Sequence, residues 1–220
     1  YVPAFYEPEY NEDGTIKRVS KLYDDAPDRV KRALIQDLDK AEFPVENIVP
    51  FIETVHDRSV VETFRGCTRG CRFCQAGMIY RPVRERKKDT IKNLAENQLA
   101  NTGHDELSLL SLSTSDYSRF EELAIELMEM CAGQNVSLSL PSLRLDSFSF
   151  KVLQEIQEYR KSGLTFAPEA GSQRLRDVIN KNITEDNIFG AVEKAIELYS
   201  NYNVMSFGTN WYEDLCIYLK

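Results

Sequence analysis

Residues 65–77 read RGCTRGCRFCQAG and hold three cysteines, Cys67, Cys71 and Cys74, in a Cys-x3-Cys-x2-Cys spacing. Thiols this close together in a chain are typical of a metal site. A structural zinc site normally closes with four ligands, whereas a cubane iron–sulfur cluster can be held by three thiolates, which leaves one iron open to a further ligand. The glycines of this stretch would let the loop wrap closely. The stretch therefore favours an iron–sulfur site.

The other two cysteines and the two histidines keep a zinc site open as an alternative. Cys131 falls on the apolar stripe of a predicted helix and Cys216 stands near the end of the sequence, so we expect both to be packing residues. His56 or His104 could supply a fourth zinc ligand after folding. Five cysteines, three of them within eight residues, do not resemble a disulfide framework and indicate a reducing compartment.

The composition is that of a globular protein. The chain has 220 residues, of which 42% are hydrophobic, and this is enough for one or two ordinary cores. No window approaches about eighteen unbroken apolar residues, and the opening YVPAFYEPEYNEDG lacks the pattern of a secretory signal. The sequence therefore predicts a cytoplasmic protein with no membrane segment. Because the sequence opens with Tyr1, we expect a piece of a longer product or a processed one.

The net charge of −8 conceals one basic segment. Between residues 65 and 88 the only acidic residue is Glu85, against eight basic residues: Arg65, Arg69, Arg72, Arg81, Arg84, Arg86, Lys87 and Lys88. This segment could face a negatively charged cofactor or a phosphate-bearing macromolecular substrate, or it could be a solvated helix start. The acidic remainder of the chain argues against a general nucleic-acid-binding surface.

From Val60 onward, short apolar runs alternate with helical patterns. We predict strands over residues 59–64, 106–113, 135–141 and 163–168. Regular alternation of strand and helix predicts an α/β fold with parallel strands joined by right-handed crossovers. Residues 1–59 are predicted to be a lead-in or linker, which leaves 60–220 as the core domain.

Four helices are predicted between and after these strands. One covers residues 87–103 and is ended by Gly103. The next starts at Ser118, with Glu121 three residues later as a capping box, and presents Phe120, Leu123, Ala124, Leu127 and Cys131 on one face. A third carries Val152, Leu153 and Ile156, and Thr184 caps the fourth, whose inward face holds Ile188, Val192, Ala195 and Tyr199. In the lead-in we predict a turn at residues 11–14 and a short helix with Val30, Leu34 and Leu38 on one face.

Serine alternates with apolar residues in two of the predicted strands. Ser137 and Ser139 alternate with Val136, Leu138 and Leu140, and the earlier strand region carries Ser108, Ser111, Ser113 and Ser115. If helices cover the outer face of a curved parallel sheet, the serines point into its interior, which suits a hydrophilic cofactor. The alternative is an exposed face on an open sheet.

The segment CTRGCRFC, with an aromatic residue before the third cysteine, resembles the signature of the radical S-adenosylmethionine (radical SAM) enzymes, and it follows the predicted strand VVETF. Further similarity extends over about residues 50 to 200. There the segments HDRSVVETFRGCTRGCRFCQAGMIYRPVRER, LSLLSLSTSDYS, LPSLRLDSFS and GLTFAPEAGSQRLRDVINKNITED resemble successive blocks of the uncharacterised cobalamin-binding radical SAM proteins.

The resemblance implies a partial (β/α) barrel of the radical SAM type, with about four β/α units and incomplete at its C-terminus. It implies a [4Fe-4S] cluster on Cys67, Cys71 and Cys74, with S-adenosylmethionine bound at the open iron. The implied activity is reductive cleavage of S-adenosylmethionine to a 5′-deoxyadenosyl radical, which takes a hydrogen atom from an unknown substrate.

The resemblance also implies contacts with the cofactor. Phe73 would pack near the adenine, the segment Ser113, Thr114, Ser115 and Asp116 would approach the methionine amine, Glu169 would lie near the cofactor, and Arg144 would meet its carboxylate. From the residues alone each charged position has a structural alternative: Glu169 as a favourable helix start, Asp116 as a turn residue and Arg144 as a surface ion-pair partner.

The implied partners are a reductant such as flavodoxin or ferredoxin and the unknown substrate. Cobalamin is expected only in a full-length protein, because residues 1–59 resemble the linker that follows a cobalamin-binding domain and not the domain itself. At about thirty residues per β/α unit, the chain is too short for the complete partial barrel, and the stretch after Asn201 does not match the next strand of the family. The alternatives are therefore a non-catalytic iron–sulfur or zinc-binding module, or an inactive truncated fragment.

Overall fold

The computed structural model describes residues 1–52, 54–147, 149, 151–152, 154–155, 164–198 and 205–209. The chain divides into two compact units, Tyr1–Gln36 and Asp37–Lys220. Within the described residues, every helix is too short or too polar to cross a lipid bilayer.

The first unit is built on a β-hairpin. A 3-10 turn, η1 (Pro3–Phe5), leads into β1 (Tyr6–Tyr10), which pairs antiparallel with β2 (Ile16–Lys21). The predicted turn is confirmed: the Gly14 N–H donates to the Asn11 carbonyl at 3.0 Å, and Gly14 has a φ of 80°. Glycine tolerates this left-handed conformation because it has no Cβ.

The short helix predicted around Val30, Leu34 and Leu38 was wrong, because residues 30–35 have no regular structure. At the end of this segment, side chains bind the backbone in other ways. The Asp37 carboxylate accepts the Asp39 N–H at 3.0 Å, and the Leu38 carbonyl accepts a hydrogen bond from the Arg86 guanidinium.

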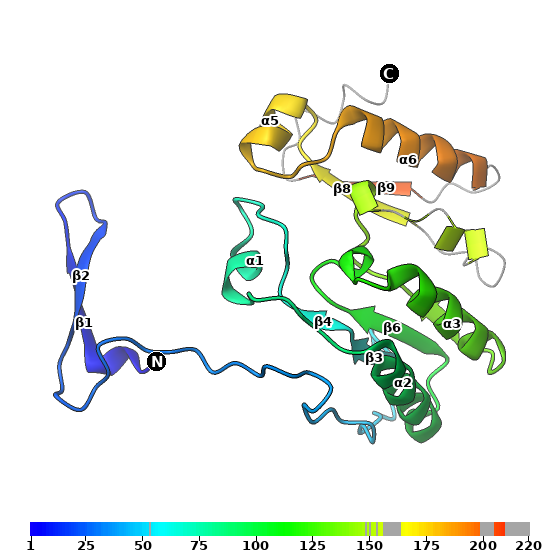
Figure 1. Ribbon diagram of the computed structural model, residues 1–220, viewed down its shortest axis with the longest axis horizontal. Coiled ribbons are helices and arrows are strands. Elements are labelled where there is room, and N and C mark those ends of the chain that lie inside the picture. Colours follow the sequence, from blue (N-terminus) through cyan, green and yellow to red (C-terminus); the bar gives the residue numbers. More distant parts are fainter. Residues whose placement is uncertain are drawn as a thin grey trace. The chain divides into compact units, whose positions relative to one another are not determined.

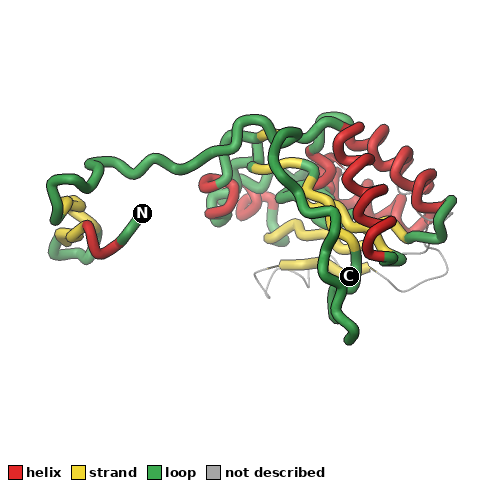
Figure 2. The backbone as a smooth tube through the Cα atoms, turned by 90° about the horizontal axis from the view of Figure 1, so that it is seen from below, coloured by secondary structure: helices red, strands yellow, loops and turns green. Residues whose placement is uncertain are grey.

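The second unit contains a parallel sheet of three strands, ordered β3 (Ser59–Glu62), β6 (Glu106–Leu110) and β7 (Ser137–Ser139). Helices α2 (Lys88–Thr102) and α3 (Phe120–Ala132) cover one face of this sheet (Figures 1 and 2). The core between them consists of buried apolar side chains, among them Val61, Leu107, Leu109, Ile91, Ala95, Leu123 and Leu127. Each fully buried valine, leucine or isoleucine side chain contributes about 1.5–3 kcal/mol to stability.

The two faces of β7 differ as the serine pattern predicted. Val136, Leu138 and Leu140 pack against the core. Because successive side chains of a strand point to opposite faces, Ser137 and Ser139 lie on the face away from it. Ser139 is the register partner of Ser108 in β6, so this polar face extends across neighbouring strands.

The ends of α2 and α3 show one correct and one wrong prediction. Gly103 ends α2 in a left-handed conformation with a φ of 71°, and its N–H donates to the Leu99 carbonyl at 2.9 Å. The capping box at Ser118 was wrong. The Ser118 N–H donates to the Glu85 carboxylate at 2.9 Å, and the Ser118 hydroxyl binds the same carboxylate. Helix α3 therefore starts at Phe120, after Arg119, without a side-chain cap. The predicted buried face of α3, including Cys131, is confirmed.

A small hairpin closes the base of the cysteine segment. β4 (Phe64–Arg65) follows β3 directly and pairs antiparallel with β5 (Arg84–Glu85). Between them lie the Cys loop, which we define as residues 66–74, and the short helix α1 (Gln75–Ile79). The Cys loop therefore leaves and rejoins the fold at a fixed place, at the carboxyl end of β3.

The C-terminal part contains β8 (Leu164–Glu169), which pairs parallel with β9 (Met205–Thr209), and the helices α5 (Gln173–Val178) and α6 (Glu185–Leu198). The sequence resemblance did not predict β9, which forms through main-chain pairing along β8. After β7, residues 151–152 and 154–155 are helical and Val152 is buried, as predicted. The predicted residues Leu153, Ile156, Gly163, Tyr199 and Cys216 lie outside the described residues, as do the side-chain surroundings of Ala195.

The α/β prediction is confirmed, with four β/α units starting at β3, β6, β7 and β8. Over the described ranges the strands form separate parallel sheets, β3-β6-β7 and β8-β9, and do not close into a barrel. The short helices η2 (Thr114–Asp116) and η3 (Leu145–Ser147) follow β6 and β7. Loops after parallel strands lie at the carboxyl edge of a sheet, so this edge collects the segments in which the site residues were predicted.

Residues 38–45 are part of the second unit. The buried Arg86 side chain donates to the Leu38 carbonyl and lies over the Phe43 ring at 5.2 Å. The Asp39 carboxylate accepts the Lys87 N–H at 2.8 Å. The predicted boundary at residue 59 stays a prediction. These contacts attach residues before that boundary to Arg86 and Lys87, which lie after it.

Candidate functional site

The Cys loop begins with a turn that only glycine fits. Gly66 has a φ of 91°, and a Cβ at this position would come within 2.8 Å of the carbonyl oxygens of Tyr80 and Pro82. A real Cβ cannot approach backbone oxygens so closely. The glycine therefore lets the start of the loop lie directly against the segment that leads back to β5.

The three thiols of the Cys loop are free. Cys67 and Cys71 are buried, whereas Cys74 is half-buried and its Sγ accepts the Gly77 N–H at 3.4 Å. Among the described residues, no three His, Cys, Asp or Glu side chains are grouped so that they could hold a metal ion. The donor set is nevertheless of the kind that an iron–sulfur cluster requires, because three free thiols stand within eight residues of one loop. Their role as cluster ligands stays a prediction.

Arginines hold the backbone of the Cys loop. Arg81 donates from Nε to the Cys67 carbonyl at 3.3 Å and from Nη2 to the Arg69 carbonyl at 2.7 Å. Hydrogen bonding to Asp116, more than the charges of Asp116, Asp146 and Cys67, raises the pKa of Arg69 above its ordinary value, although burial acts in the opposite direction.

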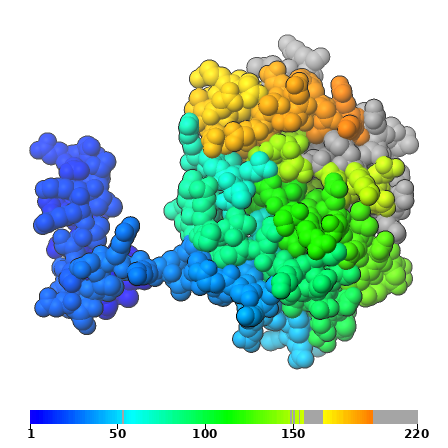
Figure 3. Space-filling view, viewed as in Figure 1, coloured from blue at the N-terminus to red at the C-terminus, as the bar shows by residue number. Residues whose placement is uncertain are grey.

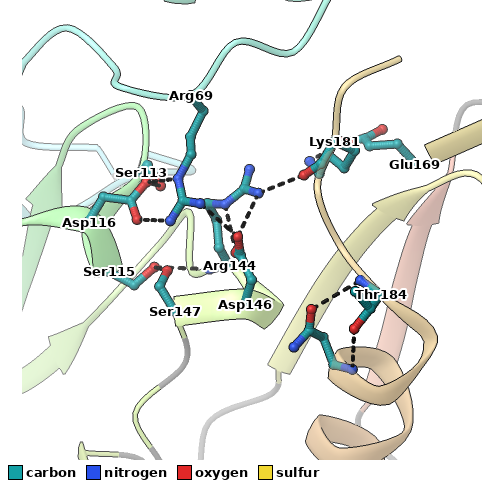
Figure 4. Close-up of polar contacts among 11 residues, drawn as sticks. Arg69, Ser113, Ser115, Asp116, Arg144, Asp146, Ser147, Glu169, Lys181 and Thr184 are labelled. Atoms are coloured by element: carbon teal, nitrogen blue, oxygen red, sulfur yellow. Dashed lines mark hydrogen bonds and ion pairs between the residues drawn. The ribbon is translucent and has the colours of Figure 1, made fainter. Parts of the chain in front are cut away.

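Arg69 links the Cys loop to the ends of β6 and β7 (Figure 4). Its Nε donates to Asp116 Oδ2 at 2.8 Å and its Nη2 donates to the other oxygen of the same carboxylate. Its Nη1 donates to Asp146 Oδ2 at 2.7 Å. One guanidinium therefore joins three segments, and the bidentate pair with Asp116 sets its orientation as well as its charge.

The Asp116 carboxylate is stabilised in its charged form. Burial alone would raise its pKa, but hydrogen bonds from Arg69 and Ser113 and the charges of Arg69 and Arg144 outweigh that effect and hold the pKa below its ordinary value. The Ser113 hydroxyl donates to Asp116 Oδ2 at 2.7 Å. Asp116 is therefore more than the turn residue that its sequence position allowed.

The predicted residues Arg144 and Ser115 lie together. The Arg144 N–H donates to Ser115 Oγ at 3.1 Å, and Ser115 Oγ lies 2.9 Å from Ser147 Oγ. The Arg144 guanidinium donates to both Asp146 oxygens, at 2.9 and 3.2 Å, and to the Lys181 carbonyl at 2.9 Å. Its side chain is only 10% exposed, so the alternative of a surface ion pair does not describe it.

Glu169, at the end of β8, has a left-handed backbone with a φ of 72°. Such a conformation in a residue other than glycine or asparagine costs of order 1–3 kcal/mol and is often found at functional sites. Its carboxylate accepts a hydrogen bond from Lys181 Nζ at 3.1 Å. Lys181 Nζ in turn lies 5.8 Å from the centroid of the Phe73 ring. Phe73 is 49% exposed, so its ring is accessible for stacking.

The structure thus brings the predicted residues to one edge of the fold. Ser113, Asp116, Arg144, Ser115 and Glu169 belong to a chain of polar contacts that reaches the Cys loop at Arg69 (Figure 4). Lys181, in the same chain of contacts, also lies over the Phe73 ring of that loop. Arg69 was expected only as one of the basic residues facing a negatively charged group, and Asp146 and Lys181 were not predicted, although these three residues connect the others. Arg69 stands between two cysteines and Asp146 two residues after Arg144, and these positions were the available signals.

The zinc alternative through a histidine finds no support in the geometry. His56 precedes β3, and its Nδ1 lies 2.8 Å from Arg58 Nη2. His104 precedes β6, with Nδ1 at 3.2 Å from Ser59 Oγ and Nε2 at 3.2 Å from Asp57 Oδ1. Both histidines therefore lie at the amino ends of the strands, whereas the Cys loop follows the carboxyl end.

The side chains of the basic segment, residues 65–88, interact with other groups of the same chain. Its side chains contact carboxylates or backbone carbonyls of the chain: Arg65 with Glu62, Arg69 with Asp116, Arg72 with Val178, Arg81 with Cys67, Arg84 with Pro82, Arg86 with Glu62, Lys87 with Asp39, and Lys88 with Glu126. Much of this charge therefore serves the fold, and a phosphate-bearing substrate stays a prediction.

Known proteins resemble this chain in sequence and in fold. An uncharacterized protein of Methanocaldococcus jannaschii is 33% identical over 192 residues, which cover 86% of this chain and 42% of the relative. The chain thus spans about two fifths of that relative's length.

Two solved structures resemble the fold. The radical SAM methyltransferase TsrM from Kitasatospora setae, with cobalamin and a [4Fe-4S] cluster bound, matches with a TM-score of 0.54 at 13% identity over 69% of this chain and 30% of TsrM. The cobalamin-dependent radical SAM enzyme OxsB, with aqua-cobalamin bound, matches with a TM-score of 0.51 at 15% identity over 68% of this chain and 23% of OxsB. At this identity the likeness shows the fold alone.

The profile of the family described as the Radical SAM superfamily matches residues 61–213. This range starts in β3 and includes the Cys loop and the segments that carry Asp116, Arg144 and Glu169. The match supports a radical SAM enzyme in general terms. The chain belongs to the radical SAM superfamily.

Proposed function

We propose that residues 1–220 are part of a radical SAM enzyme that holds a [4Fe-4S] cluster on Cys67, Cys71 and Cys74 and binds S-adenosylmethionine beside it. The bound cluster would supply the electron that cleaves S-adenosylmethionine to a 5′-deoxyadenosyl radical. A flavodoxin- or ferredoxin-type protein is the proposed source of that electron. The substrate from which hydrogen is taken is unknown.

One observation carries this proposal. In a protein of this superfamily, the loop with three free thiols is joined through Arg69 to the polar contacts at the carboxyl edge of the sheet. The thiols would bind iron, and the exposed Phe73 ring would stack on the adenine. Asp116, Ser113 and Ser115 would orient the methionine amine, Arg144 would meet the cofactor carboxylate, and Glu169 would lie near the cofactor. In this arrangement Arg69 and Asp146 hold the acidic and basic groups in place.

Anaerobic reconstitution with iron and sulfide tests the proposal. We expect about four irons and four sulfides per chain, together with release of 5′-deoxyadenosine when dithionite and S-adenosylmethionine are added. Cys71→Ala should lose both. Cys131→Ala is the matched control, because Cys131 is buried in the α3 core, and this variant should keep both.

Two results would count against the proposal in different ways. A complete cluster without cleavage of S-adenosylmethionine would favour an electron-transfer module or an inactive fragment. One zinc per chain and no iron would favour a structural metal site. Cobalamin remains a proposal for a longer protein only, and no described residue is assigned to it.

A further inference from the structure

Lys181 stands where four segments of the second unit meet. Its N–H donates to the Arg176 carbonyl at 2.9 Å, at the end of α5, and its carbonyl accepts from Arg144, in the loop after β7, at 2.9 Å. Its Nζ donates to Glu169, at the end of β8, and lies over Phe73 of the Cys loop. The side chain is 10% exposed. Both ends of this residue are therefore held, and its charge has a defined position.

The segment that carries Lys181 is attached to the Cys loop by further contacts. The Arg72 N–H donates to the Ile179 carbonyl at 2.9 Å, and Asn180 Nδ2 donates to the Gly70 carbonyl at 2.8 Å. A Cβ on Gly70 would come within 2.9 Å of Asn180 Nδ2, which shows how closely the two segments approach. In the space-filling view the Cys loop (cyan-green) lies directly against the segment that follows β8 (yellow) (Figure 3).

The backbone around Lys181 has one defined shape. Asn180 and Asn182 both adopt left-handed conformations, with φ values of 55° and 56°. Asparagine tolerates this conformation better than other residues with a side chain. The two asparagines thus turn the chain on either side of Lys181, so that its side chain lies between Glu169 and Phe73.

We propose that Lys181 is a positioning residue that fixes the Phe73 ring and, through its buried positive charge, makes a cluster on the Cys loop easier to reduce. This inference rests on the proposed function. A cation attracts a cluster more strongly after the cluster has gained an electron, and a charge sheltered from solvent is weakly screened. A cation–π contact within about 6 Å also restrains the aromatic ring.

The sign of the effect follows from charge alone. Removing the Lys181 ammonium makes the site more negative by one charge, whichever of Lys181 and Glu169 lies closer to the cluster, and so moves the midpoint potential to a more negative value. Lys181→Arg keeps the charge. The double variant Lys181→Met/Glu169→Gln removes a neutral pair, so its shift should be smaller than that of Lys181→Met.

Redox titration of the reconstituted protein, followed by the electron paramagnetic resonance signal of the reduced cluster, tests the proposal. We expect a more negative midpoint potential in Lys181→Met, a value close to wild type in Lys181→Arg, and partial recovery in the double variant. Lys92→Met is the matched control, because Lys92 also pairs with a carboxylate, Glu126 at 2.7 Å, but does so between the outer helices α2 and α3. The midpoint potential of the cluster in Lys92→Met should equal that of the wild type.

The outcomes separate this inference from the proposed function. A wild-type protein that takes up no iron and sulfide overturns the proposed function and this inference with it. A cluster with the same potential in wild type and Lys181→Met overturns the inference alone. Equal shifts in Lys181→Met and Lys181→Arg would also overturn it, because loss of packing would then explain them. If Lys181→Met does not fold, Glu169→Gln changes the charge of the same pair in the opposite direction and should move the potential to a less negative value. An unchanged potential in that variant would overturn the inference.

Discussion

Asp116 keeps its negative charge although its side chain is only 11% exposed, because Arg69, Ser113 and Arg144 outweigh the cost of burial. We predict that Asp116→Asn lowers the free energy of unfolding by about 2 kcal/mol at pH 7, since it removes charged hydrogen bonds and leaves Arg69 with one carboxylate fewer. Urea unfolding at several pH values measures the difference.

The pH dependence of that difference has a definite direction. The folded-state pKa of Asp116 is depressed, so its contribution is complete above the ordinary aspartate pKa of about 3.9 and is lost as the pH falls through the lower folded-state value. The gap between wild type and Asp116→Asn should therefore narrow below about pH 4. Asp25→Asn, at an exposed position, should show no such gap. A gap that stays constant with pH would contradict the role given to the charge.

Gly66 and Gly103 allow a matched test of the turn that starts the Cys loop. Both have positive φ values, but only Gly66 would bring a Cβ within 2.8 Å of backbone oxygens, whereas a Cβ on Gly103 meets nothing within 4 Å. Gly103→Ala should cost about 1–2 kcal/mol of folding free energy from backbone strain. Gly66→Ala should cost more and should also reduce iron uptake. Equal losses in the two variants would show that the contact with Tyr80 and Pro82 is unimportant.

The sequence correctly predicted those parts of the helices that depend on contacts between residues close together in the chain. The end of α2 at Gly103 and the buried face of α3 follow from residues within a few turns of each other. The start of α3 could not be predicted in this way, because Glu85 competes for Ser118 from 33 residues away. Leu38, the last apolar residue of the predicted lead-in helix, is likewise bound by a distant residue, since Arg86 donates to its carbonyl from 48 residues away.

The candidate site shows the same division. The spacing of Cys67, Cys71 and Cys74 was visible because the three lie in one loop. The pairing of Arg69 was not predicted, because its partners Asp116 and Asp146 lie 47 and 77 residues away. A single sequence does not indicate which arginine will meet which carboxylate after strands β6 and β7 have paired.

Helix α6 has the capping that the sequence predicted. Thr184 Oγ1 accepts the Asn187 N–H at 3.2 Å, and Asn187 Oδ1 accepts the Thr184 N–H at 3.0 Å. Thr184→Ala should lower the free energy of unfolding by about 1 kcal/mol, because the Asn187 N–H at the helix start loses its side-chain acceptor. Thr184→Ser keeps the hydroxyl and should stay close to wild type in the same denaturation experiment. Identical losses for alanine and serine would point to the threonine methyl group instead.

At the scale of the whole molecule, the polar contacts at the carboxyl edge join the first three β/α units to the fourth. Arg69 connects the Cys loop to the loops after β6 and β7, and Lys181 connects β8 and α5 to the Cys loop. In the part of the chain that the structure describes, the parallel sheets β3-β6-β7 and β8-β9 share no backbone pairing. Side-chain contacts at this edge therefore supply part of the connection that continuous strand pairing would give in a closed barrel.

Two shortened chains test where the second unit begins. A chain that starts at Asp37 should unfold with the free energy of the whole second unit, because Tyr1–Gln36 is a separate compact unit. A chain that starts at Val60 should be less stable by about 3 kcal/mol. It lacks Leu38, which is 1% exposed, and it leaves the buried Arg86 without the Leu38 carbonyl and the Phe43 ring. Leu38→Ala in the whole chain should reproduce about 2 kcal/mol of that loss. Equal stability of the two shortened chains would instead support residue 59 as the boundary of the core domain.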